Sequence, residues 1–99
     1  MENPILNRSR IRKINGGFGF IPHAFNQKGY LAKIEGNALL LYFFLILVAD
    51  QNGVSYYSDL KVCRLLDLST GDLFAARDQL VAMDLLAFIP PVYQVLELP

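Results

Sequence analysis

The sequence is poor in the side chains on which metal sites, disulfide frameworks and most nucleophilic active sites depend. It contains one cysteine, Cys63, one histidine, His23, and no tryptophan. A single cysteine excludes an internal disulfide and a thiolate metal cluster. The lone histidine has no second ligand or paired base near it in the sequence. Because no carboxylate pair has the setting of an acid/base site either, we predict that the protein is not an enzyme and binds no cofactor or metal.

Long hydrophobic runs are also missing. The longest, Ala38–Ala49, has 12 residues, whereas a helix that crosses a membrane needs about 20. The first residues, MENPILNRSRIRK, contain no apolar segment of the kind that secretory signals carry. We therefore expect a cytoplasmic protein. Its 99 residues allow one domain with a modest core, and its hydrophobic content of 54% is high enough to leave an apolar interface as well.

Charge is balanced overall but unevenly distributed. Residues 1–33 carry six basic side chains and one acidic side chain (net +5), and residues 34–99 carry three basic and eight acidic side chains (net −5). A basic segment beside an acidic body suits contact with nucleic-acid phosphates. It equally suits docking on an acidic surface of the chain itself or of a partner. We predict that residues 1–17 form a flexible basic arm and that residues 18–99 form a single domain.

The most strongly indicated helix is Glu35–Asp50, which lacks proline and is apolar around most of its circumference. A helix of this kind is expected to be central and covered on several sides. Gly53 follows it and can take the left-handed conformation that ends many helices. We expect Phe18–Phe25 to be extended, because Pro22 interrupts any helix there, and Gln27–Ile34 to be a short mixed segment.

Capping and turn residues place the remaining elements. Ser58 and Ser69 are suited to begin helices, because a serine hydroxyl can accept a hydrogen bond from a free amide of the first turn. Pro90-Pro91 has the fixed backbone angles that suit a hairpin tip. The pattern predicts helices at Asp59–Leu66 and from Ser69 to about Met83, and strands at Val54–Tyr57, Ala87–Ile89 and Val92–Leu98.

This order of elements resembles a winged helix-turn-helix domain. The residues that carry the resemblance are Leu68-Ser69, Ala76-Arg77, Leu80 and Asp84-Leu85-Leu86. They are similar to a family pattern of Ser, about seven residues, an Ala-Leu or Ala-Arg pair, Leu, and Gly-Leu-Ile before the wing. Asp84 stands where the family often has Gly.

The resemblance covers Glu35–Leu98, 64 of the 99 residues. More loosely, the chain resembles small winged-helix proteins of bacterial mobile elements and the N-terminal domains of plasmid-type replication initiators. It implies a mainly α fold of three helices with a small β wing, a two- to three-stranded antiparallel sheet. It also implies that double-stranded DNA is a partner.

The helix after Ser69 is nevertheless unusual for a DNA-contacting helix. Leu73, Ala76 and Leu80 share its core face, and Arg77 lies at the edge of that apolar arc. We therefore expect Arg77 to form an internal ion pair, with Asp59, Asp67 or Asp84 as the candidate partners, more readily than a base contact. The candidate nucleic-acid contacts are the arm residues Arg8, Arg10, Arg12 and Lys13, then Lys61 and Arg64, and finally Thr70 and Gln79.

Aromatic residues near the wing exceed what a core of this size can hide, which is typical of interfaces. A homodimer, or a complex with another protein, is expected to use Phe74, Ala75, Ala82 and Tyr93. Two hypotheses follow. The first is a DNA-binding regulatory or genetic-element-associated factor that contacts mainly phosphates. The second is a protein-interaction or dimerisation module with an acidic third-helix face and no DNA binding.

Overall fold

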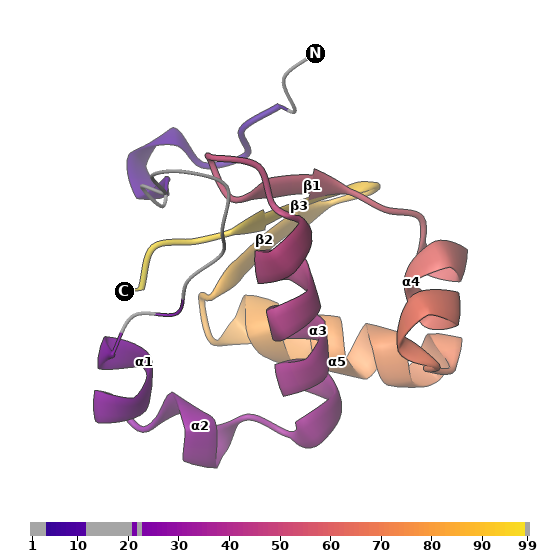
Figure 1. Cartoon of the computed structure of the whole chain (residues 1–99), viewed down its shortest axis with the longest axis horizontal. Coiled ribbons are helices and arrows are strands. Elements are labelled where there is room, and N and C mark those ends of the chain that lie inside the picture. Colours follow the sequence, from indigo (N-terminus) through magenta and orange to yellow (C-terminus); the bar gives the residue numbers. More distant parts are fainter. Residues whose placement is uncertain (1–3, 12–20, 22, 99) are drawn as a thin grey trace.

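The computed structural model describes residues 4–11, 21 and 23–98. Within them the chain forms a compact domain of five α-helices, one short 3-10 helix and a three-stranded antiparallel sheet (Figure 1). Arg12, Lys13 and half of Phe18–Phe25 (residues 18–20 and 22) lie outside the described residues. The elements are η1 (Arg8–Arg10), α1 (Ala24–Gln27), α2 (Tyr30–Lys33), α3 (Gly36–Val48), β1 (Val54–Tyr56), α4 (Asp59–Leu66), α5 (Thr70–Ala82), β2 (Leu86–Ile89) and β3 (Val92–Val95).

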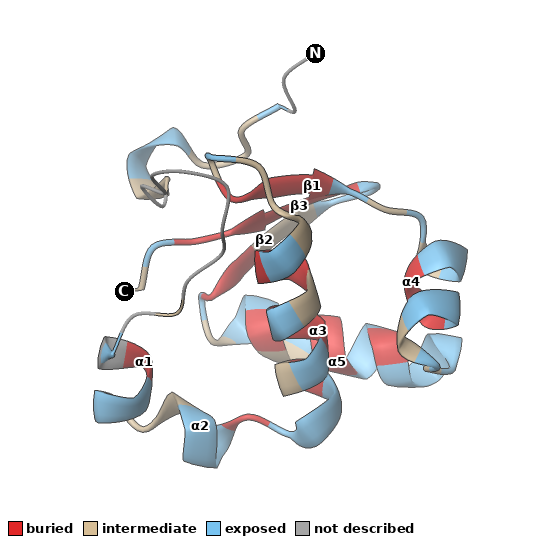
Figure 2. Ribbon diagram, in the orientation of Figure 1, coloured by how far each residue is buried: buried red, intermediate tan, exposed pale blue. Residues whose placement is uncertain are grey.

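Helix α3 is the central helix that the sequence predicts, and it packs against α5 and β3. Its buried side chains are Ala38, Leu41, Tyr42, Leu45 and Ile46. The predicted cover on several sides is only partly present, because one side of α3 faces solvent (Figure 2). No helix among the described residues has both the length and the apolar character needed to cross a membrane.

Helices α4 and α5 begin at the predicted serine caps. The Ser58 hydroxyl accepts a hydrogen bond from the Lys61 amide (3.2 Å), and the Ser69 hydroxyl accepts one from the Asp72 amide (3.1 Å). Asp67, at φ 54°, takes the left-handed conformation that ends α4. The two helices therefore meet at a tight turn, and Leu73 and Leu80 of α5 are fully buried.

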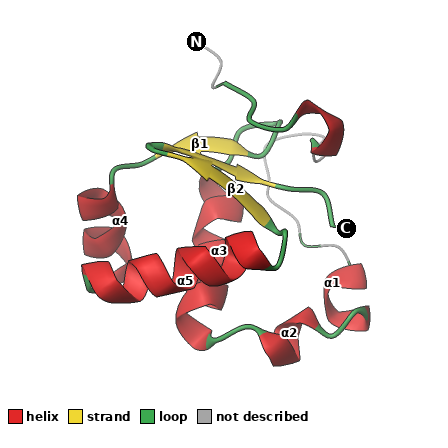
Figure 3. Ribbon diagram, turned by 180° about the vertical axis from the view of Figure 1, so that it is seen from behind, coloured by secondary structure: helices red, strands yellow, loops and turns green. Residues whose placement is uncertain are grey.

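The sheet has the strand order β1-β3-β2, so β3 is central. Strands β2 and β3 form an antiparallel hairpin whose tip contains a cis Pro90-Pro91 peptide bond. Side chains alternate along a strand. Tyr93 and Val95 consequently face the helical core, and Gln94 lies on the opposite face of the sheet. Seen from behind, the helices lie on one side of the sheet and the N-terminal residues on the other (Figure 3).

Helix α1 begins within Phe18–Phe25, which the sequence led us to expect as extended chain, and helix α2 lies within Gln27–Ile34, expected as a short mixed segment. Phe25, predicted to be extended, lies in α1 and is 2% exposed. Its ring stacks on Tyr42 with centroids 5.1 Å apart and contacts Tyr30 at 5.4 Å. Each of these helices has four residues, and helices this short are stabilised by tertiary packing more than by local propensity.

The N-terminal segment, which we define as residues 4–11, docks on the outer face of the sheet. The Asn7 amide donates to Gln94 Oε1 (2.6 Å), and Gln94 Nε2 donates to the Asn7 carbonyl (2.9 Å). Ile11 forms an antiparallel bridge with Leu96. The side chain of Gln94 is fully buried, so its amide needs such partners. Flexibility of the arm stays a prediction for residues 12–17, which lie outside the described residues.

Candidate interaction faces of the α4–α5 helix pair

Arg77 lies inside the domain and connects α5 to α4 and to the sheet. Its Nη1 donates to Asp59 Oδ1 (2.8 Å) and to the Tyr93 hydroxyl (3.0 Å). Its guanidinium carbon lies 4.0 Å from the ring centroid of Phe88 and 5.0 Å from that of Phe74. The residue is 9% exposed. The prediction of an internal ion pair is confirmed, and Asp59 is the partner among the three candidates.

The electrostatics of this cluster keep Arg77 and Tyr93 in fixed protonation states. Burial by itself lowers the pKa of Arg77, but the hydrogen bonds with Asp59 and Tyr93 outweigh it and raise that pKa. Burial also raises the pKa of Tyr93, against the opposing effect of Arg77. Arg77 therefore stays charged and Tyr93 stays neutral at ordinary pH. The guanidinium is held by the domain and is not free to contact a partner.

With Arg77 turned inward, the solvent side of α5 carries acidic, small and apolar side chains. Phe74 and Val81 are each 44% exposed. The aspartates are the only charged side chains on this side of α5, the helix that lies in front of α3 in the view of Figure 3. We call this surface the α5 face. Its exposed residues are Asp72, Phe74, Ala75, Asp78, Val81 and Ala82.

The two predicted nucleic-acid contacts of α5 occupy different positions. Thr70 is exposed at the first residue of the helix. Gln79 uses its side-chain amide inside the chain: Oε1 accepts from the Glu35 amide (3.1 Å) and Nε2 donates to the Lys33 carbonyl (3.3 Å). Gln79 thereby joins the start of α3 to the end of α2 and has a structural role.

Helix α4 presents the two predicted basic residues to solvent. Lys61 and Arg64 are exposed and are three residues apart, so they lie on one side of the helix. The Lys61 ammonium lies 5.9 Å from the centroid of the Tyr57 ring. Leu60 and Leu65 are exposed beside them, at 67% and 53%. This side of α4 thus combines two cations with two apolar side chains.

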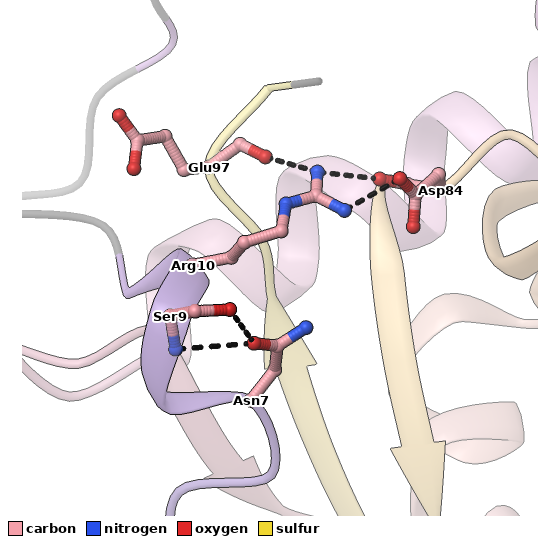
Figure 4. Close-up of polar contacts among 5 residues, drawn as sticks. All are labelled: Asn7, Ser9, Arg10, Asp84 and Glu97. Atoms are coloured by element: carbon pink, nitrogen blue, oxygen red, sulfur yellow. Dashed lines mark hydrogen bonds and ion pairs between the residues drawn. The ribbon is translucent and has the colours of Figure 1, made fainter.

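Of the two predicted arm arginines that the structure describes, Arg10 is held by contacts within the chain and Arg8 is exposed. Arg10 Nη1 pairs with the Asp84 carboxylate (2.5 Å), and its Nη2 donates to the carbonyls of Asp84 and Glu97 (Figure 4). Asn7 Oδ1 accepts from the Ser9 amide and hydroxyl, which fixes the η1 turn. Arg8 is exposed in that turn. Arg10 therefore joins the N-terminal segment to the start and the end of the β2–β3 hairpin.

Tyr93 was predicted to lie in an interface, and the structure shows that this prediction is wrong. It is fully buried, its ring lies 4.5 Å from the Phe88 centroid, and its hydroxyl accepts from Arg77, so its side chain cannot contact a partner. Phe74, Ala75 and Ala82 are exposed as an interface requires. Sequence reasoning missed the exposed side of α3, where Leu47 is 77% exposed. A helix that is apolar all round has no polar side in its sequence, so the pattern does not show which side faces solvent.

Within the part of the chain that the structure describes, no group of three or more His, Cys, Asp or Glu side chains is placed to hold a metal ion. Comparison with protein-family models, with curated proteins and with solved structures finds no match for this chain.

Proposed function

We propose that the chain is a winged helix-turn-helix domain. The order α3, β1, α4, α5, β2, β3 supports this, with the tight α4–α5 turn as the helix-turn-helix and the β2–β3 hairpin as the wing. Asp84 adds a detail, since it has φ 62°. Glycine adopts this region without strain and aspartate tolerates it, which explains how Asp84 can stand where the resembled pattern has Gly.

We infer that this domain works as a protein-interaction module and that the α5 face is its docking surface. The inward position of Arg77 carries the inference, because it leaves two aspartates as the only charges of α5 at the surface. Base contacts favour Arg, Lys, Asn and Gln, and the α5 face has none of these. Exposed apolar residues flanked by carboxylates suit instead a partner surface that is apolar and basic.

The docking role is tested with a photo-crosslinking amino acid placed at Ala75 in the cells that make the protein. We expect an adduct with another protein, and we expect Asp78→Lys to reduce its yield several-fold because it places like charges across the interface. The same crosslinker at Gln51, which is exposed after α3, is the control and should give no such adduct. An adduct at Ala75 that is indifferent to Asp78→Lys, or no adduct, would contradict the role.

Duplex DNA is a second candidate partner, and the exposed pair Lys61 and Arg64 on α4 is the observation that favours it. Arg8 is a further exposed cation of the N-terminal segment. Such contacts would bind phosphates and not base edges. Binding would therefore depend steeply on salt and little on sequence.

A salt titration of binding to a short random-sequence duplex tests the DNA candidate. Each phosphate contact contributes a slope of about −0.9 to the plot of log affinity against log salt, so Lys61→Ala/Arg64→Ala should make that slope shallower by about 1.8. Lys61→Arg/Arg64→Lys keeps both charges and should preserve the slope. If the unaltered chain does not bind the duplex even at low salt, DNA is not its partner.

A further inference from the structure

One side of α3 exposes a stripe of large apolar side chains. Leu40, Phe43 and Leu47 are 41%, 42% and 77% exposed, and their spacing of three and four residues places them on the same side of the helix. Leu31 of α2, at 44% exposed, belongs to the same surface. We call these four residues the α3 face. In Figures 1 and 2, α3 lies in front of α5, with α1 and α2 beside it.

The α3 face also contains a hollow. A pocket of about 230 Å³ opens next to Phe43, between α3 and the α1–α2 segment. Its wall is mostly apolar, and it is lined by Ile21, His23, Phe25, Asn26, Leu31 and Phe43. Leu47, the most exposed large apolar residue among those described, lies one helical turn from Phe43, or about 6 Å along the axis. One surface therefore holds both a projection and a recess.

The charge pattern of α3 distinguishes this surface from an ordinary solvent-exposed helix side. Its sequence, GNALLLYFFLILV, contains no charged residue over Gly36–Val48. A helix side that stays in water normally carries charged or polar residues, and an apolar patch of this kind marks an interaction site. A partner surface meets no fixed charge along the helix and gains apolar burial over the stripe.

We propose that the α3 face pairs with the α3 face of a second copy of this chain, in a two-fold symmetric dimer. Two-fold symmetry requires a surface that is complementary to itself. When two α3 helices cross antiparallel, the projecting Leu47 of each copy reaches the recess beside Phe43 of the other. Leu47 and the pocket beside Phe43 lie on the same face and are separated along the helix axis. An antiparallel pair needs this separation, because each Leu47 must meet the pocket of the other copy.

The domain is large enough for this pairing. A stable dimer buries about 800 Å² per protomer, roughly a seventh of the 5824 Å² surface. Helix α3 lies in front in Figure 1, which looks onto the broad side of a domain of 35 × 33 × 21 Å.

This pairing is independent of docking through α5. The α5 helix lies behind α3 in the view of Figure 1, so the α5 face is on the other broad side of the domain. A dimer through α3 leaves two α5 faces accessible and presents them together. Loss of either interaction can therefore be measured without loss of the other.

Sedimentation equilibrium and light scattering of the full chain over a wide concentration range test the dimer. Leu47→Glu should weaken dimerisation by about 30-fold or more, because it places a charge at the centre of an apolar contact. Leu60→Glu is the matched control, since it makes the same substitution at a leucine of α4 that is 67% exposed. It should leave the dimer dissociation constant unchanged. Both leucines are largely exposed, so both variants should retain the thermal unfolding midpoint of the monomer.

A dimer that Leu47→Glu dissociates and Leu60→Glu preserves supports the pairing. A chain that remains monomeric at every concentration overturns it. So does a dimer that Leu47→Glu leaves intact, because the contact must then lie elsewhere. Growth beyond two copies would overturn the closed two-fold arrangement, and none of these outcomes affects the crosslink from Ala75.

Discussion

Arg77→Ala should lower the free energy of unfolding by about 3 kcal/mol, out of the roughly 5–15 kcal/mol that stabilise a typical domain. The Tyr93 hydroxyl loses the donor at 3.0 Å, and an unsatisfied buried polar group costs about 1–3 kcal/mol. Contacts of the guanidinium with the Phe74 and Phe88 rings are lost as well, at about 1–2 kcal/mol. Loss of the ion pair with Asp59 contributes less to the fall in the free energy of unfolding, because the Asp59 side chain is 41% exposed and water can solvate it.

Urea unfolding followed by circular dichroism measures this effect. Arg64→Ala is the matched control, because it removes an exposed arginine from the neighbouring helix and should change stability by no more than about 0.5 kcal/mol. Arg77→Met should recover part of the loss, since it keeps the apolar stem between the two rings. If Arg77→Ala costs no more than Arg64→Ala, Arg77 does not stabilise the fold, and its assignment as an internal residue fails.

The elements that could be predicted from the sequence are those whose signals are local. Ser58 and Ser69 cap α4 and α5 as predicted, because each hydroxyl bonds an amide three residues ahead. The β2–β3 hairpin encloses Pro90-Pro91 as predicted. The inward direction of Arg77 followed from helical periodicity alone. The choice of Asp59 as its partner required the crossing of α4 and α5, which no local pattern specifies.

The contacts that could not be predicted join residues far apart in the chain. Gln94 and Asn7 are 87 residues apart, and Arg10 and Asp84 are 74 apart. Nothing near Arg10 in the sequence distinguishes a structural arginine from one that contacts phosphate. The basic arm therefore looked more available than it is. This intramolecular use of Arg10 and Arg77, together with the side-chain bonds of Gln79, moves the proposed function from DNA toward protein docking.

The exposed side of α3 was unpredictable for a different reason. Periodicity assigns a buried side only when polar residues mark the opposite one, and α3 has no charged residue over Gly36–Val48. The side that faces solvent is decided by where α5 and the sheet pack. An exposed apolar side on such a helix is therefore information that only the structure provides, and it is the basis of the dimer proposed above.

Gly53→Ala should also cost about 3 kcal/mol, for reasons that lie in the backbone. Gly53 has φ 82°, and a Cβ built there would lie 2.6 Å from the carbonyl oxygen of Val95. The left-handed conformation alone costs an alanine about 1–2 kcal/mol. Relief of the clash requires movement of β3 away from the turn. That movement strains the 2.8 Å hydrogen bond from the Val95 amide to the Gly53 carbonyl, which is worth about 1 kcal/mol.

Gly36→Ala is the control for Gly53→Ala, because it makes the same substitution where the backbone allows it. Gly36 begins α3, and a Cβ there meets nothing within 4 Å. Alanine favours helix over glycine, so this variant should gain about 0.5 kcal/mol. Thermal unfolding of the two variants should therefore move in opposite directions. Equal shifts would mean that the Gly53 turn tolerates a side chain, and that the close approach of β3 to the end of α3 is not required for the fold.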